Sequence, residues 1–131
     1  MASALPRLLC YGHDDMLLFT RKKILEREFS VEMCTRISEL DAVLANGPIE
    51  IAVVCHSVSD AECEEMMHRL REHSPGVKVL VLYESMPDLC SSHSDESMEN
   101  LEGPSTLLQK VRELMQEAAH DNARDSGSPV A

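Results

Sequence analysis

The stretch IEIAVVC, residues 49–55, decides the fold class, because it is nearly all apolar after Glu50. A second run of the same kind, VKVLVLY, occupies residues 77–83. Continuous apolar runs of this length are typical of parallel strands that are covered on both faces. The sequence therefore predicts an α/β protein built around a buried parallel sheet.

The segments on either side of these runs alternate between strand and helix patterns. Further strands are predicted at residues 8–11 and 30–35, with a weak one at 97–101. Apolar residues at helical spacing predict helices at residues 14–28, 37–44 and 59–73, and a last helix that Gly103-Pro104 opens. Ser59 and Glu62 have the spacing of a capping box, in which Glu62 reaches back to the Ser59 amide. This order predicts a three-layer sandwich with a five-stranded parallel sheet.

Length and charge limit the function classes. The 131 residues suit one domain, which we expect at residues 1–119, with a disordered tail at 120–131. The 12 basic and 23 acidic residues give a formal net charge of -11, which argues against binding to nucleic acid or to an anionic membrane. No apolar run reaches the roughly 18 residues of a membrane span, and the N-terminus is unlike a signal peptide. We therefore expect a cytoplasmic protein whose five cysteines are reduced.

Open parallel sheets bind their ligands beyond the carboxyl ends of the strands. The residues to consider at those ends are Gly12, His13, Asp14, Asp15, Cys55, His56, Tyr83 and Glu84. The basic residues of the first helix, Arg21, Lys22, Lys23 and Arg27, are instead expected on a solvated outer face.

The layout resembles the receiver domain of bacterial two-component response regulators, a CheY-like, flavodoxin-like fold, over roughly residues 6–118. The resemblance rests on Gly12-His13-Asp14-Asp15 after the first strand, on the two buried runs, and on the closing helix GPSTLLQKVREL at 103–114. It implies the strand order 2-1-3-4-5 and a place in phosphorelay signal transduction.

The resemblance also implies that the functional motifs of receivers are altered in this chain. The family's magnesium-binding acidic pair falls on Gly12 and His13, with Asp14 just beyond. The phosphoacceptor aspartate falls on Cys55, the small hydroxyl residue on Tyr83, and the lysine of the fifth strand near Asn100. Magnesium requires oxygen ligands and an acyl phosphate requires a carboxylate, so we expect an atypical receiver that is not phosphorylated, has no cofactor and is not an enzyme.

An alternative function uses the same strand ends. His13, Cys55 and His56 are soft-metal ligands, so a Cys/His-based metal or redox sensor on this scaffold is conceivable. The cysteines show no C-x-x-C pair, however, and adjacent strand residues point to opposite faces, so packing in the core is the favoured interpretation.

Residues 84–102 form an acidic segment without lysine or arginine. Its acidic residues are Glu84, Asp88, Asp95, Glu96, Glu99 and Glu102. The segment is shorter than in receivers, which predicts that the fourth helix is short or missing. In receivers the fourth helix, fifth strand and fifth helix form the output surface. We therefore expect a stand-alone domain that acts through a protein partner and is a monomer or weak dimer, and the negative charge of this surface favours a basic partner.

Overall fold

The computed structural model describes residues 5–55, 58–83, 95–99 and 103–127 of the chain. Five strands and four helices lie within these ranges. The strands are β1 (Arg7–Tyr11), β2 (Ser30–Cys34), β3 (Ile51–Val54), β4 (Lys78–Tyr83) and β5 (Glu96–Glu99). The helices are α1 (Asp15–Leu25), α2 (Ile37–Leu44), α3 (Asp60–His73) and α5 (Pro104–Gly127).

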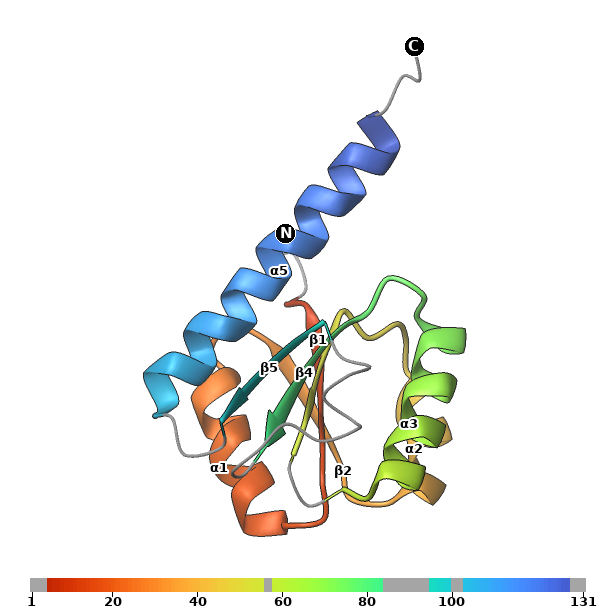
Figure 1. The fold of residues 1–131 in the computed structure, drawn as a ribbon, viewed down its shortest axis with the longest axis vertical. Coiled ribbons are helices and arrows are strands. Elements are labelled where there is room, and N and C mark those ends of the chain that lie inside the picture. The colour runs from red at the N-terminus through yellow and green to blue at the C-terminus, as the bar shows by residue number, and fades with distance from the viewer. Residues whose placement is uncertain (1–4, 56–57, 84–94, 100–102, 128–131) are drawn as a thin grey trace.

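All strand pairs are parallel, and the order β2-β1-β3-β4-β5 confirms the predicted topology. Figure 1 shows α1 and α5 on one face of the sheet and α2 and α3 on the other. The sheet is thus covered on both sides, which explains why every residue of β3 is buried. The carboxyl ends of the strands meet at one edge, where the predicted site residues follow them.

Strand β1 divides its side chains between two hydrophobic layers. Leu8 and Cys10 pack in the layer under α1 and α5, whereas Leu9 and Tyr11 pack in the layer under α2 and α3. This alternation follows from the two-residue repeat of a strand. All four side chains are fully buried, so β1 is the centre of both layers.

Helix starts follow the polar residues that precede them. Asp14 caps α1 by accepting a hydrogen bond from the Leu17 amide at 3.1 Å, and Ser59 Oγ accepts from the Glu62 amide at 3.3 Å at the start of α3. The predicted Ser59 cap is therefore confirmed. The Glu62 carboxylate, however, contacts Tyr11 and His13 rather than the Ser59 amide that the capping box predicts.

Two boundaries and one cysteine differ from the sequence-based expectations. Helix α1 ends at Leu25 rather than near residue 28, and α5 extends to Gly127, into the segment expected to be a disordered tail. Cys63 is disulfide-bonded, so the expectation that all five cysteines are reduced is wrong at this position. Burial in the core, which we expected for cysteines, does hold for Cys63 as well.

Two expectations concern residues that the structure does not describe. The short or missing fourth helix was predicted for the acidic segment, of which residues 84–94 lie outside the described ranges, as do residues 128–131 of the tail. Within the described ranges, none of the helices combines the length and the apolar character that crossing a membrane requires.

Candidate functional site

Backbone hydrogen bonds hold the ends of β1, β2 and β3 together at the carboxyl edge of the sheet. The Gly12 amide donates to the Cys34 carbonyl at 3.2 Å, and the Cys55 amide donates to the Tyr11 carbonyl at 2.8 Å. Both bonds continue the strand pairing by one residue beyond the strands. Gly12 and Cys55 are therefore fixed at the strand ends, as the sequence predicted.

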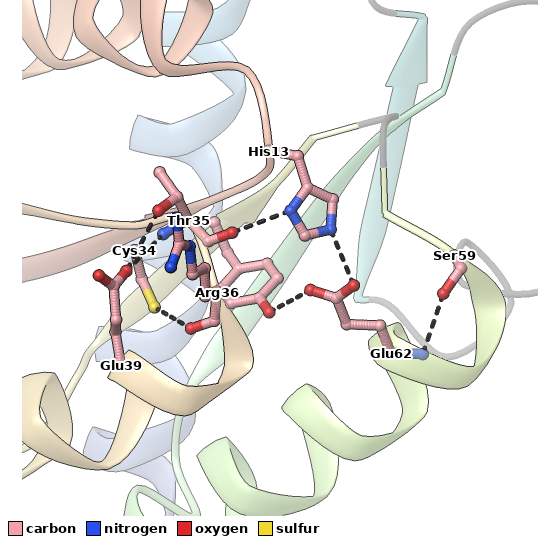
Figure 2. A network of polar contacts seen from close by, with 8 residues as sticks. His13, Cys34, Thr35, Arg36, Glu39, Ser59 and Glu62 are labelled. Carbon is pink, nitrogen blue, oxygen red and sulfur yellow. Dashed lines mark hydrogen bonds and ion pairs between the residues drawn. The ribbon is translucent and has the colours of Figure 1, made fainter.

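His13, the next residue, joins three elements through both nitrogens of its ring (Figure 2). Its Nδ1 lies 2.8 Å from the Thr35 carbonyl oxygen, and its Nε2 lies 2.8 Å from Glu62 Oε1. A carbonyl only accepts hydrogen bonds, so Nδ1 donates. The Nε2 atom faces the Glu62 carboxylate, so each ring nitrogen has a partner within the fold. Both nitrogens are thus engaged within the protein and are not available as metal ligands or as a catalytic base.

Glu62 also accepts a hydrogen bond from the hydroxyl of Tyr11 through its second oxygen. Tyr11 is fully buried, whereas the Glu62 side chain is 20% exposed, so the carboxylate lies between the core and the surface. Burial, together with the hydrogen bond to Glu62, raises the pKa of the Tyr11 hydroxyl well above its usual value. The hydroxyl therefore remains a donor to the carboxylate at neutral pH.

The connection from β2 to α2 is fixed by local hydrogen bonds beside His13. The Cys34 thiol donates to the Arg36 carbonyl at 3.1 Å, and the Thr35 hydroxyl donates to Glu39 Oε1 at 3.1 Å. Burial raises the pKa of Cys34 to about 11, so this thiol is protonated at neutral pH. These hydrogen bonds flank the Thr35 carbonyl, which accepts from His13 Nδ1 (Figure 2).

Cys55 contacts a buried arginine on the opposite side of the sheet. Nη1 of Arg21, on α1, lies 2.6 Å from the Cys55 sulfur, and the two residues are 5% and 2% exposed. Burial raises the pKa of the Cys55 thiol, and the guanidinium opposes this effect. The expectation that Arg21 lies on a solvated face is therefore wrong. Its spacing carried the signal, because Arg21 follows Leu17 by four residues and Leu18 by three, on the apolar stripe of the helix.

The metal ligands proposed from the sequence do not come together. The His13 ring contacts α3 and the β2–α2 connection, whereas Cys55 packs in the layer under α1 and α5. His56 lies outside the described residues. Within the described ranges, no group of three or more His, Cys, Asp or Glu side chains could hold a metal ion.

The remaining predicted residues have varied surroundings. Asp14 and Asp15 are exposed at the start of α1, and Tyr83 is half-buried at the end of β4. Of the acidic segment, Asp95 accepts a hydrogen bond from the Val79 amide at 2.7 Å, and Glu96 lies 3.8 Å from the Lys110 amine. These two carboxylates therefore have partners within the fold. Glu99 belongs to β5, and Glu84, Asp88, Asn100 and Glu102 lie outside the described residues.

The combination of five parallel strands in the order 2-1-3-4-5 with helices on both faces is the CheY-like, flavodoxin-like fold. Solved structures of receiver domains share it. The receiver domain protein of Methanospirillum hungatei JF-1 matches with a TM-score of 0.77 and 25% identity, over 90% of this chain and 99% of that chain.

Two further structures extend this likeness. The structure described as adenylate cyclase from Rhodopirellula baltica matches with a TM-score of 0.79 and 18% identity, over 97% of this chain and 99% of that one. The response regulator TrrA of Thermotoga maritima, solved in complex with Mg²⁺-BeF, matches with a TM-score of 0.69 and 18% identity, over 84% of this chain and 99% of that chain. No protein-family model and no curated protein sequence matches the chain. The fold is thus that of response-regulator receivers, and it suggests a role in signalling.

Proposed function

We propose that this chain is an atypical receiver-like signalling domain of the cytoplasm that is not phosphorylated and acts by contact with a protein partner. The observation that carries the proposal is the Arg21–Cys55 pair. Cys55 directly follows β3, where the resemblance puts the phosphoacceptor, and its thiol is buried against a guanidinium. A thiol does not form the acyl phosphate that a carboxylate forms, and a buried sulfur is out of reach of a phosphoryl donor.

The surroundings of Cys55 do not fit magnesium either. Magnesium takes oxygen ligands in octahedral geometry, usually with one or two carboxylates. Gly12 offers no side chain, His13 offers nitrogens that already bind Thr35 and Glu62, and Cys55 offers a neutral thiol. The Arg21 guanidinium supplies a fixed positive charge at this strand end, which disfavours a second cation there.

Phosphorylation can be tested directly. We expect no added phosphoryl mass after incubation with Mg²⁺ and acetyl phosphate, and no spectral change with beryllofluoride. The Thermotoga maritima regulator, whose structure contains Mg²⁺-BeF, serves as the positive control. Stoichiometric modification that disappears in Asp14→Asn or Asp15→Asn would overturn the proposal, because one of these carboxylates would then act as a replacement acceptor.

The partner surface is tested by charge. We expect a variant with Glu84→Gln, Asp88→Asn, Glu99→Gln and Glu102→Gln to lose the partner that the wild-type chain retains in a pull-down. The matched control neutralises the exposed Glu64 and Glu72 of α3 and should retain it. Equal recovery with both variants would place the contact outside the acidic segment.

The alternative of a Cys/His metal or redox sensor makes a different prediction. It requires stoichiometric zinc or copper in protein purified without a histidine tag, with loss of the metal in Cys55→Ser. Our proposal expects no such metal, because His13 and Cys55 face different layers of the fold. It also expects slow reaction of the Cys55 thiol with a thiol reagent in the native protein, since burial raises its pKa.

A further inference from the structure

Strand β2 lies at an edge of the sheet, and within the described ranges it pairs with β1 alone. The Ser30 amide and the Cys34 carbonyl bond to the residues that flank β1, at 2.8 and 3.2 Å. Since the residues of a paired strand point their backbone groups alternately to either side, Val31 and Met33 direct theirs away from β1. No hydrogen bond in the described part of the chain engages these groups. The edge therefore offers open donors and acceptors to another strand.

The side chains on this edge are apolar on one face and form an ion pair on the other. Val31 packs against the layer under α1 and α5, and Met33, two residues on, shares that face and is 39% exposed. Glu32, between them, lies on the opposite face, where its carboxylate is 3.0 Å from Nη2 of Arg7. Charged side chains commonly protect edge strands from pairing, but here the charge is balanced within the fold.

The edge is complementary to a second copy of itself when that copy runs antiparallel, with the two-fold axis at Glu32. Val31 then lies opposite Met33 of the second copy, and the two residues exchange their free backbone hydrogen bonds. The same pairing is repeated on the other side of the axis, so every outward N–H meets an outward C=O. The exposed Met33 side chain packs beside Val31 of the second copy, because both lie on the same face of the extended sheet. Such self-complementarity is what a two-fold interface requires.

We propose that this chain forms a weak two-fold dimer through antiparallel pairing of its β2 strands. The contact is short, so the dimer has a Kd of roughly 0.1–1 mM. The two Glu32 side chains face each other at the axis, where the Arg7 guanidinium of each copy offsets their repulsion. The net charge of -11 on each copy opposes association, so added salt strengthens the dimer. The surface lies at the opposite edge of the sheet from β5 and is independent of the proposed function.

Amide hydrogen exchange followed by NMR tests the surface residue by residue. We expect the amides of Val31 and Met33 to exchange roughly 3–7-fold more slowly at about 2 mM protein than at about 20 μM, because exchange occurs from the monomer. The Glu32 amide is the internal reference, since it bonds to β1 in both states. Sedimentation equilibrium should show a dimer that becomes tighter as NaCl rises from about 20 to about 300 mM. Exchange that is independent of concentration at both edge amides, or weaker association at high salt, would overturn the proposal.

The position of the contact is tested by placing a charge on the exposed edge. Met33→Lys puts an ammonium group against Val31 of the second copy and should abolish the dimer at about 2 mM protein. Met16→Lys is the matched control, because it makes the same change at a methionine of α1 that is 80% exposed, and it should associate as the wild type does. Dispersed NMR signals check that both variants fold. Association of Met33→Lys equal to that of the wild type, or loss of the dimer in both variants, would refute the assigned surface.

Discussion

Replacing Glu62 with alanine should destabilise the protein more than replacing Tyr11 with phenylalanine, although both changes break the same hydrogen bond. The reason is the difference in burial between the two partners. Tyr11 is fully buried, so Glu62→Ala leaves its hydroxyl without an acceptor in the core, which costs about 1–3 kcal/mol. Glu62→Ala also removes the contact with the His13 ring, whose side chain is 43% exposed, so this loss adds only about 0–1 kcal/mol.

Tyr11→Phe removes the donor and leaves Glu62 with His13 and with water. The expected cost is therefore about 0.5–1.5 kcal/mol, against about 1–4 kcal/mol for Glu62→Ala. For a chain of 131 residues, the cost of Glu62→Ala corresponds to a fall in Tm of roughly 4–15 °C. Once Phe occupies position 11, adding Glu62→Ala should cost less than it does alone, because no buried hydroxyl remains to be orphaned.

Urea unfolding of the two single variants and the double variant measures this coupling. Asp60→Ala is the matched control, since Asp60 is the other acidic residue in the first turn of α3 and has the same relation to the helix dipole. If Glu62→Ala costs no more than Asp60→Ala, or if the double variant is additive within about 0.5 kcal/mol, the Tyr11–Glu62 bond does not stabilise the fold as argued.

Three further predictions concern other parts of the fold. Folding raises the pKa of the Cys34 thiol from 9.0 to about 11, so the neutral thiol should contribute about 2 kcal/mol to the free energy of unfolding. This contribution is fully present below pH 9 and is lost as the pH rises toward 11. Between these pH values, the free energy of unfolding measured in urea should therefore fall less steeply for Cys34→Ala than for the wild type. Gly47→Ala should cost about 1–3 kcal/mol in the same assay, because the φ of Gly47 is 137° and the new Cβ would lie 3.3 Å from Arg7 Nη1; a change below about 0.5 kcal/mol would contradict this reasoning. Arg7→Met should lower the Tm measurably, since it leaves the Val43 and Gly47 carbonyls without their donor, whereas Arg112→Met, at an exposed ion pair, should leave the Tm unchanged; equal effects of the two would refute the distinction.

The arrangement of strands and helices could be predicted from the sequence because it depends on hydrophobic patterns within short segments. The two apolar runs that form β3 and β4 are unlike any of the helices in the described residues, and parallel strands are usually joined by helical crossovers. Strand β5 was predicted weakly at 97–101 and lies at Glu96–Glu99, because its apolar content is small and its position depends on pairing with β4.

The site was predicted only in part, because side-chain partners depend on contacts between distant segments. Gly12, His13 and Cys55 could be placed at the strand ends by counting from the strands. Arg21 was treated as a surface charge and Glu62 as part of a helix cap, since charge patterns along one helix do not reveal what lies opposite. The apolar stripe of α1 could have indicated the burial of Arg21, whereas nothing near Glu62 in the sequence indicates Tyr11.

The alternation of β1 restricts how this sequence can change. Cys10 faces the layer of α1 and α5, and Tyr11 faces the layer of α3, so one inserted or deleted residue in β1 would exchange their surroundings. The tyrosine hydroxyl would then lie on the face away from Glu62, and the Glu62 carboxylate would face the Cys10 thiol instead. Related sequences that keep this fold should therefore vary at β1 by substitution and keep its length, even where the residues after it differ.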